Sequence, residues 1–410
     1  MRRRKDPGSP SRRTCAGPRT FAALLLLALA ACGGEPTTFA QLMKQVNALD
    51  GTAKSAAIEA YVQSHGGTPL IENQARLVFL RQVQDPAEPP RVVGDFNRWA
   101  ATADGVYDPQ AGVMARIEGT DWWYLEAPAF TNARMEYVFL DGRDTRPDPL
   151  NPRTVASQVG PRSEVRMPFF ESQPELEDES PVPTGRVEET EVASQALGGT
   201  RRVWFYTPPG YDAAPDDVFF PVVYVLDGGQ YVQRMGVPRV LDRLIAREAI
   251  PPVVVVFVEP EDRQAEYSRN VAWRHFMSDE LVPLVDQRFR TFPAPDQRVV
   301  LGSSLGAYGA MDLAVEASGT FGAVVAIAPP VQTATIITNQ PHAQAIARSL
   351  RICVIGGLYD EMIAGARSLR TALDDANAAI TYVEVPEGHN WDMFRGHLDD
   401  ALSAALAPGP

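Results

Sequence analysis

Cysteine is scarce in this sequence. The 410 residues include three cysteines, too few for a disulfide framework. Cys353 lies in the apolar stretch RICVIG, where a buried and unreactive thiol is expected. Histidine is also scarce, and no group of histidine, cysteine and carboxylate residues has the spacing of metal ligands. We therefore expect no disulfide scaffold, no metal site and no other cofactor.

The sequence also lacks an excess of positive charge. Its 38 lysines and arginines face 51 aspartates and glutamates, which gives a formal net charge of -13 and a pI near 5.0. This balance disfavours binding to nucleic acid phosphates. The hydrophobic share of 45% is that of a folded protein, and 410 residues exceed one ordinary core, so two domains with ancillary segments are expected.

An apolar run near the N-terminus, FAALLLLALAA, is too short to span a bilayer. It follows a basic stretch and precedes Cys32 directly, which is typical of an export signal. The residues LAAC resemble the lipobox of bacterial lipoproteins, and this resemblance implies that Cys32 is lipidated. We expect residues 1–31 to be a signal peptide and the mature chain to be exported and lipid-anchored in the bacterial cell envelope. Cleavage that leaves a soluble secreted protein is the alternative.

The next segments differ in pattern. After a short tether, FAQLMKQVNAL and AKSAAIEAYVQS have helical spacing and are separated by Asp-Gly, so a helical hairpin is predicted within residues 32–69. Residues 169–186 are acidic, rich in proline and without apolar periodicity. They predict an inter-domain linker.

Short β-prone runs between residues 70 and 168 predict a small immunoglobulin-like β-sandwich. The stretches VVGDFNRW, GTDWWYLEAP, EYVFLDG and DPLNP resemble, in this order, the early-set domain (similar to carbohydrate-binding module 48) of enterochelin esterases and glycogen-active enzymes. Trp99, Trp122 and Trp123 could form an aromatic platform for a sugar or catecholate ring, but we favour a role in packing.

Residues 187–410 alternate apolar strand-like runs with helical patterns. The runs VVYVL, VVVVFV, RVVL and RICVIG are rich in valine and isoleucine, which indicates strands covered on both faces. We therefore predict an α/β domain with a mainly parallel sheet enclosed by helices.

The stretch RVVLGSSLGAYGAM places a Gly-x-Ser-x-Gly pattern between a predicted strand and a predicted helix. A nucleophile elbow needs this context, because the sharp turn exposes the serine and the helix N-terminus stabilises negative charge. Ser304 stands at the apex of the turn, and Ser303 does not. Ser304 is the candidate nucleophile.

A serine nucleophile needs a histidine base held by a carboxylate, in the chain order serine, acid, histidine. His389 follows a predicted strand in VEVPEGHNW, whereas His397 lies further on and suits a surface or capping role. Asp360 comes first after the strand RICVIG and is the candidate acid, with Glu361 in reserve. The oxyanion donors are predicted to be the amides of Leu305 and, in the LDGGQ turn, Gly229.

The stretches VWFYTPPGYD, YVLDGGQ, DELVPLVDQRF, GSSLGA, GGLYDE and GHNW resemble the esterase D and enterochelin esterase family of α/β-hydrolases, in family order. The resemblance implies the same roles for Ser304, His389 and Asp360. It also implies a substrate hydroxyl contact at Asp227 and a substrate-facing arginine at Arg269, where a surface ion pair is an equal alternative.

The sequence therefore predicts a serine esterase with an acyl-enzyme intermediate, acting on a small-molecule or glycan ester. A siderophore lactone is the leading substrate. Feruloyl or acetyl sugar esters, acyl transfer to a sugar or lipid hydroxyl and, least favoured, a non-catalytic binding lipoprotein are the alternatives. Oligomeric state is not predicted.

Overall fold

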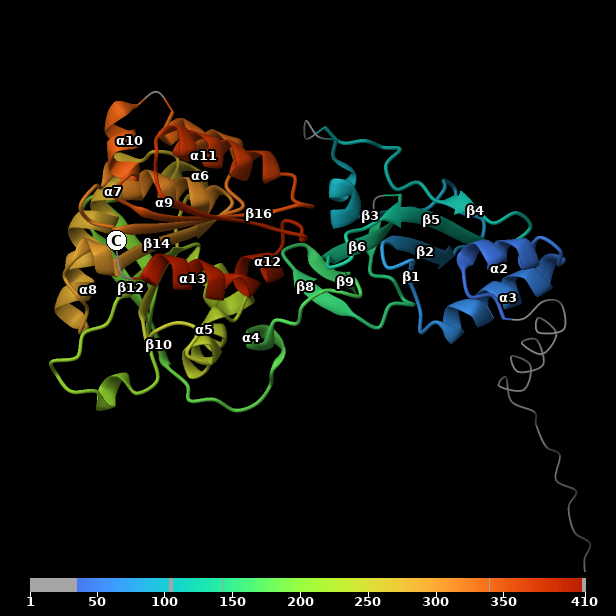
Figure 1. Cartoon of the computed structure of the whole chain (residues 1–410), viewed down its shortest axis with the longest axis horizontal. Helices are drawn as coiled ribbons and strands as arrows, with labels where there is room; N and C mark the ends of the chain where they lie inside the picture. The colour runs from blue at the N-terminus through green and yellow to red at the C-terminus, as the bar shows by residue number, and fades with distance from the viewer. Residues whose placement is uncertain (1–34, 103–105, 143, 339, 408–410) are drawn as a thin grey trace, which may run out of the picture. The chain divides into compact units, whose positions relative to one another are not determined.

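The computed structural model describes residues 35–102, 106–142, 144–338 and 340–407 (Figure 1). The predicted signal peptide and Cys32 lie outside these ranges. Within them, no helix combines the length and the hydrophobicity needed to cross a membrane. The described residues form two compact units from interleaved stretches, which are residues 35–92, 112–128 and 138–154 in the first and residues 93–111, 129–137 and 155–407 in the second.

The first unit joins two helices to a small sheet. Helices α2 (Phe39–Val46) and α3 (Gly51–Ser64) lie where the helical hairpin was predicted. The antiparallel sheet has the order β1-β2-β5-β4, with strands β1 (Leu70–Glu72), β2 (Arg76–Gln82), β4 (Ala115–Arg116) and β5 (Trp122–Pro128). Apolar side chains of both layers share one core, in which Trp122 is 3% exposed. Trp122 therefore has the packing role that we favoured.

Another sheet has five strands. Its path is β3-β6-β9-β8, and β7 pairs with β6. The strands are β3 (Arg91–Gly94), β6 (Arg134–Asp141), β7 (Asp144–Arg146), β8 (Thr154–Ser157) and β9 (Gly160–Arg166). In the second unit, residues 134–137 of β6 pair antiparallel with residues 163–166 of β9. A tight 3₁₀ segment, η1 (Asp95–Ala100), follows β3.

The main sheet of the second unit has eight strands in the order β10-β11-β13-β12-β14-β15-β16-β17. The pairs from β13 to β17 are parallel, whereas β10–β11 and β11–β13 are antiparallel, so the sheet is mixed at one edge. The strands are β10 (Arg186–Ser194), β11 (Gly199–Thr207), β12 (Val222–Leu226), β13 (Val254–Val258), β14 (Arg298–Ser303), β15 (Ala323–Ile327), β16 (Arg351–Gly357) and β17 (Ile380–Val385).

Helices cover both faces of this sheet. One face carries α6 (Arg263–Tyr267), α7 (Val271–His275), α8 (Val282–Arg288), α9 (Leu305–Glu316), α10 (Pro341–Ala347) and α11 (Ile363–Asp375). The other face carries α5 (Val237–Ala246), α12 (Trp391–Gly396) and α13 (Leu398–Leu406). Between α7 and α8 runs a π-helical segment, η4 (Phe276–Leu281). Shorter pieces complete the second unit: α4 (Pro174–Glu177), η2 (Tyr211–Ala213), η3 (Gln230–Arg234), η5 (Pro295–Gln297) and η6 (Val331–Ile336).

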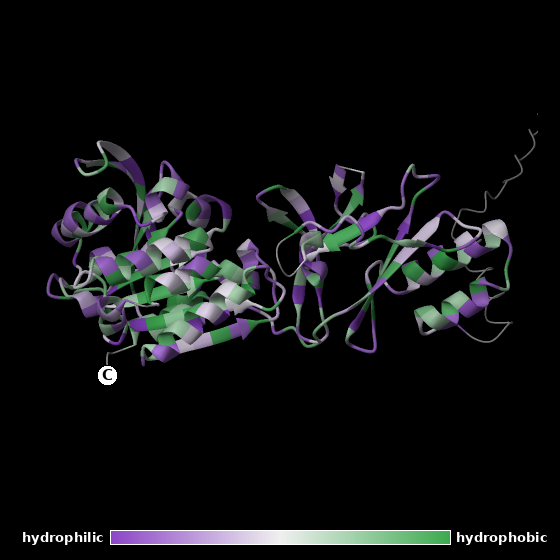
Figure 2. Cartoon of the chain, turned by 90° about the horizontal axis from the view of Figure 1, so that it is seen from above, coloured by the Kyte–Doolittle hydropathy of each residue, from purple (hydrophilic) through white to green (hydrophobic). Residues whose placement is uncertain are grey.

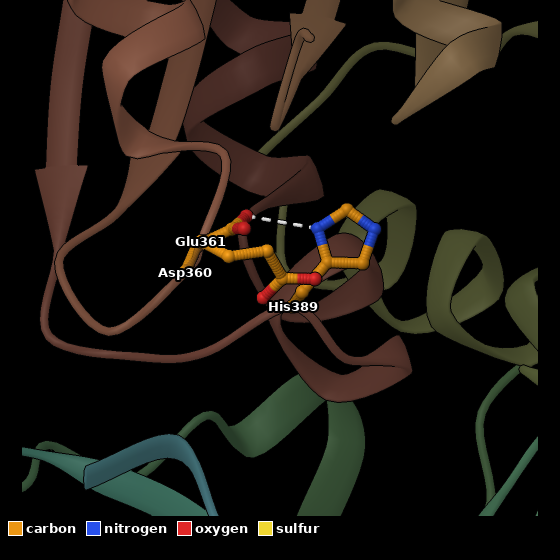
Figure 3. Close-up of side chains that lie close together, drawn as sticks. All are labelled: Asp360, Glu361 and His389. Atoms are coloured by element: carbon orange, nitrogen blue, oxygen red, sulfur yellow. Dashed lines mark hydrogen bonds and ion pairs between the residues drawn. The ribbon is translucent and has the colours of Figure 1, made fainter. Parts of the chain in front are cut away.

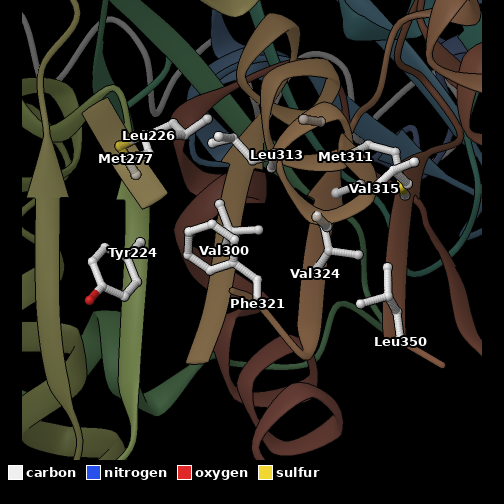
Figure 4. Close-up of a cluster of buried hydrophobic side chains, with 14 of the residues drawn as sticks. Tyr224, Leu226, Met277, Val300, Met311, Leu313, Val315, Phe321, Val324 and Leu350 are labelled. Atoms are coloured by element: carbon white, nitrogen blue, oxygen red, sulfur yellow. The ribbon is translucent and has the colours of Figure 1, made fainter. Parts of the chain in front are cut away.

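Successive strand residues contribute to different cores. Tyr224 and Leu226 of β12 belong to the core under α9, whereas Val223 and Val225 belong to the core under α5 and α13. This alternation follows from the two-residue repeat of a strand, and it explains why these strands are almost continuously apolar (Figure 2). Figure 4 shows one of the cores, with Tyr224, Val300, Met311 and Val324.

Cys353 lies inside β16 and is 1% exposed. Burial raises the pKa of its thiol to about 12. The prediction of a buried cysteine is confirmed, and a raised thiol pKa disfavours the thiolate form that reacts.

Candidate active site

Ser304 stands between strand β14 and helix α9, as the elbow pattern requires. Its backbone has φ 56° and ψ −126°, a strained conformation for a residue with a side chain. A Cβ atom at Gly302 would lie 2.1 Å from the carbonyl oxygen of Gly306, and one at Gly306 would lie 2.9 Å from Asp227 Oδ2. Both glycines are therefore needed for the turn to close.

His389 and Asp360 follow neighbouring parallel strands, β17 and β16. His389 Nδ1 lies 2.9 Å from Asp360 Oδ2, and Asp360 is fully buried (Figure 3). The other oxygen, Asp360 Oδ1, accepts a hydrogen bond of 2.7 Å from the Met362 amide, which fixes the carboxylate. Burial lowers the pKa of the His389 imidazole, but the hydrogen bond and charge of Asp360, with the charges of Glu361 and Asp95, raise it overall.

Ser304 and His389 line the same cavity, which has a volume of about 640 Å³. The Ser304 hydroxyl itself makes a contact of 3.9 Å with Met362 Sδ. The other lining residues belong to the segments at the carboxyl ends of the main-sheet strands and to the stretches 98–101 and 157–162: Arg98, Trp99, Ala101, Ser157, Gln158, Val159, Arg162, Asp227, Gln230, Arg263, Ser303, Glu361, Asn390, Trp391 and Phe394. The wall of the cavity therefore extends well beyond Ser304 and His389.

Three aromatic side chains and three arginines form part of the cavity wall. The Arg162 guanidinium lies 3.9 Å from the ring centroid of Trp99, a cation–π contact. Phe394 meets the His389 ring edge to face, with centroids 5.0 Å apart. Trp99 thus lines the cavity, whereas Trp122 and Trp123 are buried in the first unit.

The amide of Gly229 faces a partner that the sequence did not indicate. It donates a hydrogen bond of 2.5 Å to Glu259 Oε2, and a Cβ atom at Gly229 would lie 2.8 Å from the same oxygen. Burial raises the pKa of Glu259, and the hydrogen bond from Gly229 opposes this rise. Leu305, the other predicted donor, is the first residue of α9.

Asp227 is held by an arginine that sequence reasoning missed. Arg263 Nε and Nη2 donate to the two Asp227 oxygens at 2.7 and 2.8 Å, and Nη2 also lies 3.2 Å from the Ser303 carbonyl oxygen. Asp227 is 3% exposed, so its carboxylate is committed to this fork. Arg263 comes shortly after β13, just as the triad candidates come after their strands. This position in the sequence could have indicated that Arg263 belongs to the site.

Arg269 does not have the place suggested by the family resemblance. It pairs with Glu316 at 3.0 Å and with Asp312 at 3.7 Å, both on α9. Of the described residues that line the cavity, the arginine from this stretch is Arg263. The surface ion pair, the alternative given for Arg269, is what the structure contains.

Two other acid and histidine candidates have definite partners. Glu361 lines the cavity beside Asp360 and His389, and ligand atoms of these three residues lie within 4.8 Å of one another (Figure 3). His397 Nε2 lies 2.8 Å from Glu387 Oε1, and its side chain is 15% exposed, so His397 is less exposed than predicted.

Comparisons with known proteins identify the family of this chain. Residues 194–405 match the family model Esterase, described as "Putative esterase". Over 326 residues the chain is 26% identical to the iron(III) enterobactin esterase of Escherichia coli K12, covering 70% of this chain and 80% of that protein. It is also 26% identical over 277 residues to esterase Rv1288 of Mycobacterium tuberculosis H37Rv, covering 50% of this chain and 60% of that protein.

Solved structures show the same fold. The ferric enterobactin esterase of Salmonella typhimurium superposes with a TM-score of 0.67 at 21% identity, over 85% of this chain and 99% of that one. The enterobactin esterase of Shigella flexneri, solved in the presence of enterobactin, gives 0.66 at 24% identity, over 85% and 98%. Because the family match spans more than half of its residues, the chain belongs to the Esterase family and is a carboxylic ester hydrolase with an α/β-hydrolase fold.

Proposed function

We propose that the chain hydrolyses esters through Ser304, His389 and Asp360, with a covalent acyl-enzyme intermediate. The observation that carries this proposal is the 2.9 Å hydrogen bond between His389 Nδ1 and Asp360 Oδ2, in a cavity that His389 shares with Ser304. With Nδ1 engaged by the carboxylate, Nε2 is the nitrogen left to take the serine proton.

The reaction begins with a rotation of the Ser304 side chain away from Met362 and toward the imidazole, between two staggered positions. Ser304 Oγ then attacks the ester carbonyl while His389 takes its proton. The Leu305 amide, at the start of α9, stabilises the negative oxygen. The alcohol leaves with the proton from His389, and water attacks the acyl-enzyme while His389 takes a proton from it. The bond between the acyl carbon and Ser304 Oγ then breaks, His389 returns the proton to Oγ, and the carboxylic acid is released.

The proposed substrate is a siderophore-type lactone with anionic aromatic groups. Support comes from the E. coli relative, named an iron(III) enterobactin esterase, which is matched over 80% of its length. The cavity wall also offers a cation to such a substrate, because Arg98 lines it, whereas Arg162 and Arg263 are paired with Glu136 and Asp227. Aromatic rings such as Trp99 offer faces on which aryl groups stack.

The triad is tested with Ser304→Ala and His389→Asn on short aryl esters. Each variant should lose about 10³-fold or more in kcat and keep its thermal unfolding midpoint. Matched controls are Ser349→Ala and His275→Asn. Ser349 is an exposed serine whose hydroxyl bonds to a helix carbonyl, and His275 forms a surface pair of 2.6 Å with Asp279. Full turnover by either triad variant would refute the proposal.

The substrate class is tested by offering enterobactin-type lactones and feruloyl sugars to the purified protein. Preferential release of 2,3-dihydroxybenzoyl-serine supports the siderophore lactone, whereas preferential release of ferulate overturns it. Arg98→Gln should raise KM for the anionic lactone about tenfold and leave KM for a neutral aryl acetate unchanged. An equal change for both esters would argue against charge recognition.

A further inference from the structure

Asp95 is a buried carboxylate outside the stretch that matches the family model. It has no exposed surface and begins segment η1, directly after β3. Its oxygens accept hydrogen bonds from the Glu136 amide at 2.7 Å and from Trp99 Nε1 at 2.8 Å. The hydrogen bonds from Glu136 and Trp99 thus fix the position of the Asp95 carboxylate.

The same carboxylate touches the loop that carries His389. Asn390 Nδ2 donates to Asp95 Oδ2 at 3.3 Å. A Cβ atom at Gly388 would lie 2.0 Å from Asp95 Oδ1, so only glycine lets this loop approach so closely. The residues immediately before and after His389 therefore both rest on Asp95.

Asn390 also links the Asp95 contact to the start of helix α12. Its Oδ1 accepts the Met393 amide at 2.9 Å, which is the N-cap bond of α12. Phe394, on the same helix, packs against the His389 ring. A fixed Asn390 side chain therefore restrains both the loop and the ring that contacts the imidazole.

We infer that Asp95 is a positioning residue that holds the His389 loop in the geometry needed for catalysis. This inference rests on the proposed function, because it assigns a task to a residue that supports the proposed base. A second contact supports the same loop: the Arg134 side chain forms a buried ion pair with Glu387, and the Arg134 amide lies 3.3 Å from the Pro386 carbonyl oxygen. Asp95 and Arg134 thus hold the loop at four positions, Pro386, Glu387, Gly388 and Asn390.

Removal of Asp95 also changes the charge around His389. The acidic groups near the imidazole are Asp360, Glu361 and Asp95, and the basic groups that line the cavity are Arg98, Arg162 and Arg263. Asp95 itself faces Glu136, Arg162 and Glu361. Loss of its charge should move the acidic limb of the kcat/KM profile to lower pH, a change that a purely structural role would not produce.

The test uses the full chain with Asp95→Asn. We expect kcat to fall about 10-fold to 100-fold, with KM for a short aryl ester changed less than about threefold. The matched control is Asp148→Asn. Asp148 is equally buried, lies in the first unit and accepts the Leu150 amide at 2.8 Å, so its loss should affect stability and leave kcat unchanged.

Two further variants keep the test decisive if Asp95→Asn does not fold. Asn390→Ser retains an N-cap oxygen for α12 but loses the donor to Asp95, and it should reproduce the fall in kcat. The double variant Asp95→Asn with Asn390→Asp restores a donor and an acceptor between the two positions. It should recover about threefold to tenfold of the kcat lost in Asp95→Asn.

The outcomes separate the two proposals. If His389→Asn is inactive while Asp95→Asn and Asn390→Ser match Asp148→Asn in kcat and pH profile, the positioning role is overturned and the esterase mechanism stands. If His389→Asn keeps full activity, the esterase mechanism itself fails.

Discussion

The amide of Gly229 and the carboxylate of Glu259 are joined by a hydrogen bond of 2.5 Å. Gly229 follows β12 and Glu259 follows the neighbouring strand β13, so the pair lies at the carboxyl edge of the sheet with the triad candidates. An amide that donates to a carboxylate does not at the same time serve a substrate oxygen. If the Gly229 amide is an oxyanion donor, as the sequence predicts, Glu259 competes with the oxyanion for it.

Glu259→Ala should free the Gly229 amide. We expect kcat for short aryl esters to rise about threefold to tenfold. One oxyanion donor contributes a factor on the order of 10² to kcat, and part of this factor is lost while the Gly229 amide is bonded to Glu259. Steady-state kinetics with Glu261→Ala as the exposed control measures the effect. An unchanged or lower kcat would show that Gly229 is not an oxyanion donor.

The activity should depend on pH through His389. The pKa of this imidazole is raised above its ordinary 6.5, and the base must be neutral to accept the serine proton. kcat/KM should therefore be low at acidic pH and reach half of its plateau above pH 6.5. An acidic limb with its midpoint below pH 6.5 would contradict the charge environment described for His389.

Stability should fall as the pH rises toward 8. Burial, together with the charge of Asp95, raises the pKa of Glu136 from 4.5 to about 8, against the opposing charge of Arg162. Because the folded protein then binds this proton more tightly than the unfolded chain, the free energy of unfolding decreases between about pH 4.5 and pH 8. The expected loss is on the order of 5 kcal/mol.

Urea unfolding between pH 5 and pH 9 measures this dependence. Glu136→Gln should flatten the slope. The control Glu126→Gln, which removes an exposed carboxylate paired with Arg76 at 2.7 Å, should keep it. A wild-type free energy of unfolding that rises over this range would contradict the assignment.

We propose that the chain is exported and lipidated at Cys32, and this is tested in living bacteria. Cells that express the protein should incorporate labelled palmitate into it, and Cys32→Ala should abolish the label. Cys353→Ala serves as control, because that thiol is buried in β16. Label that remains without Cys32 would refute lipidation at this residue.

The elbow and the Asp360–His389 pair could be predicted because their signals are local. Ser304 is marked by an apolar strand, two glycines and a helix within a short stretch. His389 and Asp360 each follow a strand, and parallel strands end at one edge, so the order of strands places both residues near the serine.

Other parts of the site depend on contacts that leave no local signal. Arg263 and Arg269 are six positions apart in one segment, and only the loop and helix geometry decides which one reaches the cavity. Asp95 and Asn390 are separated by 295 residues, and no periodicity links them. The bond between Gly229 and Glu259 joins two loops whose side-chain directions are not encoded in strand patterns.

The Esterase match begins at residue 194, yet Arg98, Trp99 and Arg162 line the cavity. The hydrolytic machinery and the walls that receive the ester are thus encoded in different stretches of the polypeptide. Substitutions before residue 194 can therefore change substrate specificity while the candidate catalytic residues stay the same. Relatives that match this chain over residues 194–405 can therefore differ from it in substrate specificity.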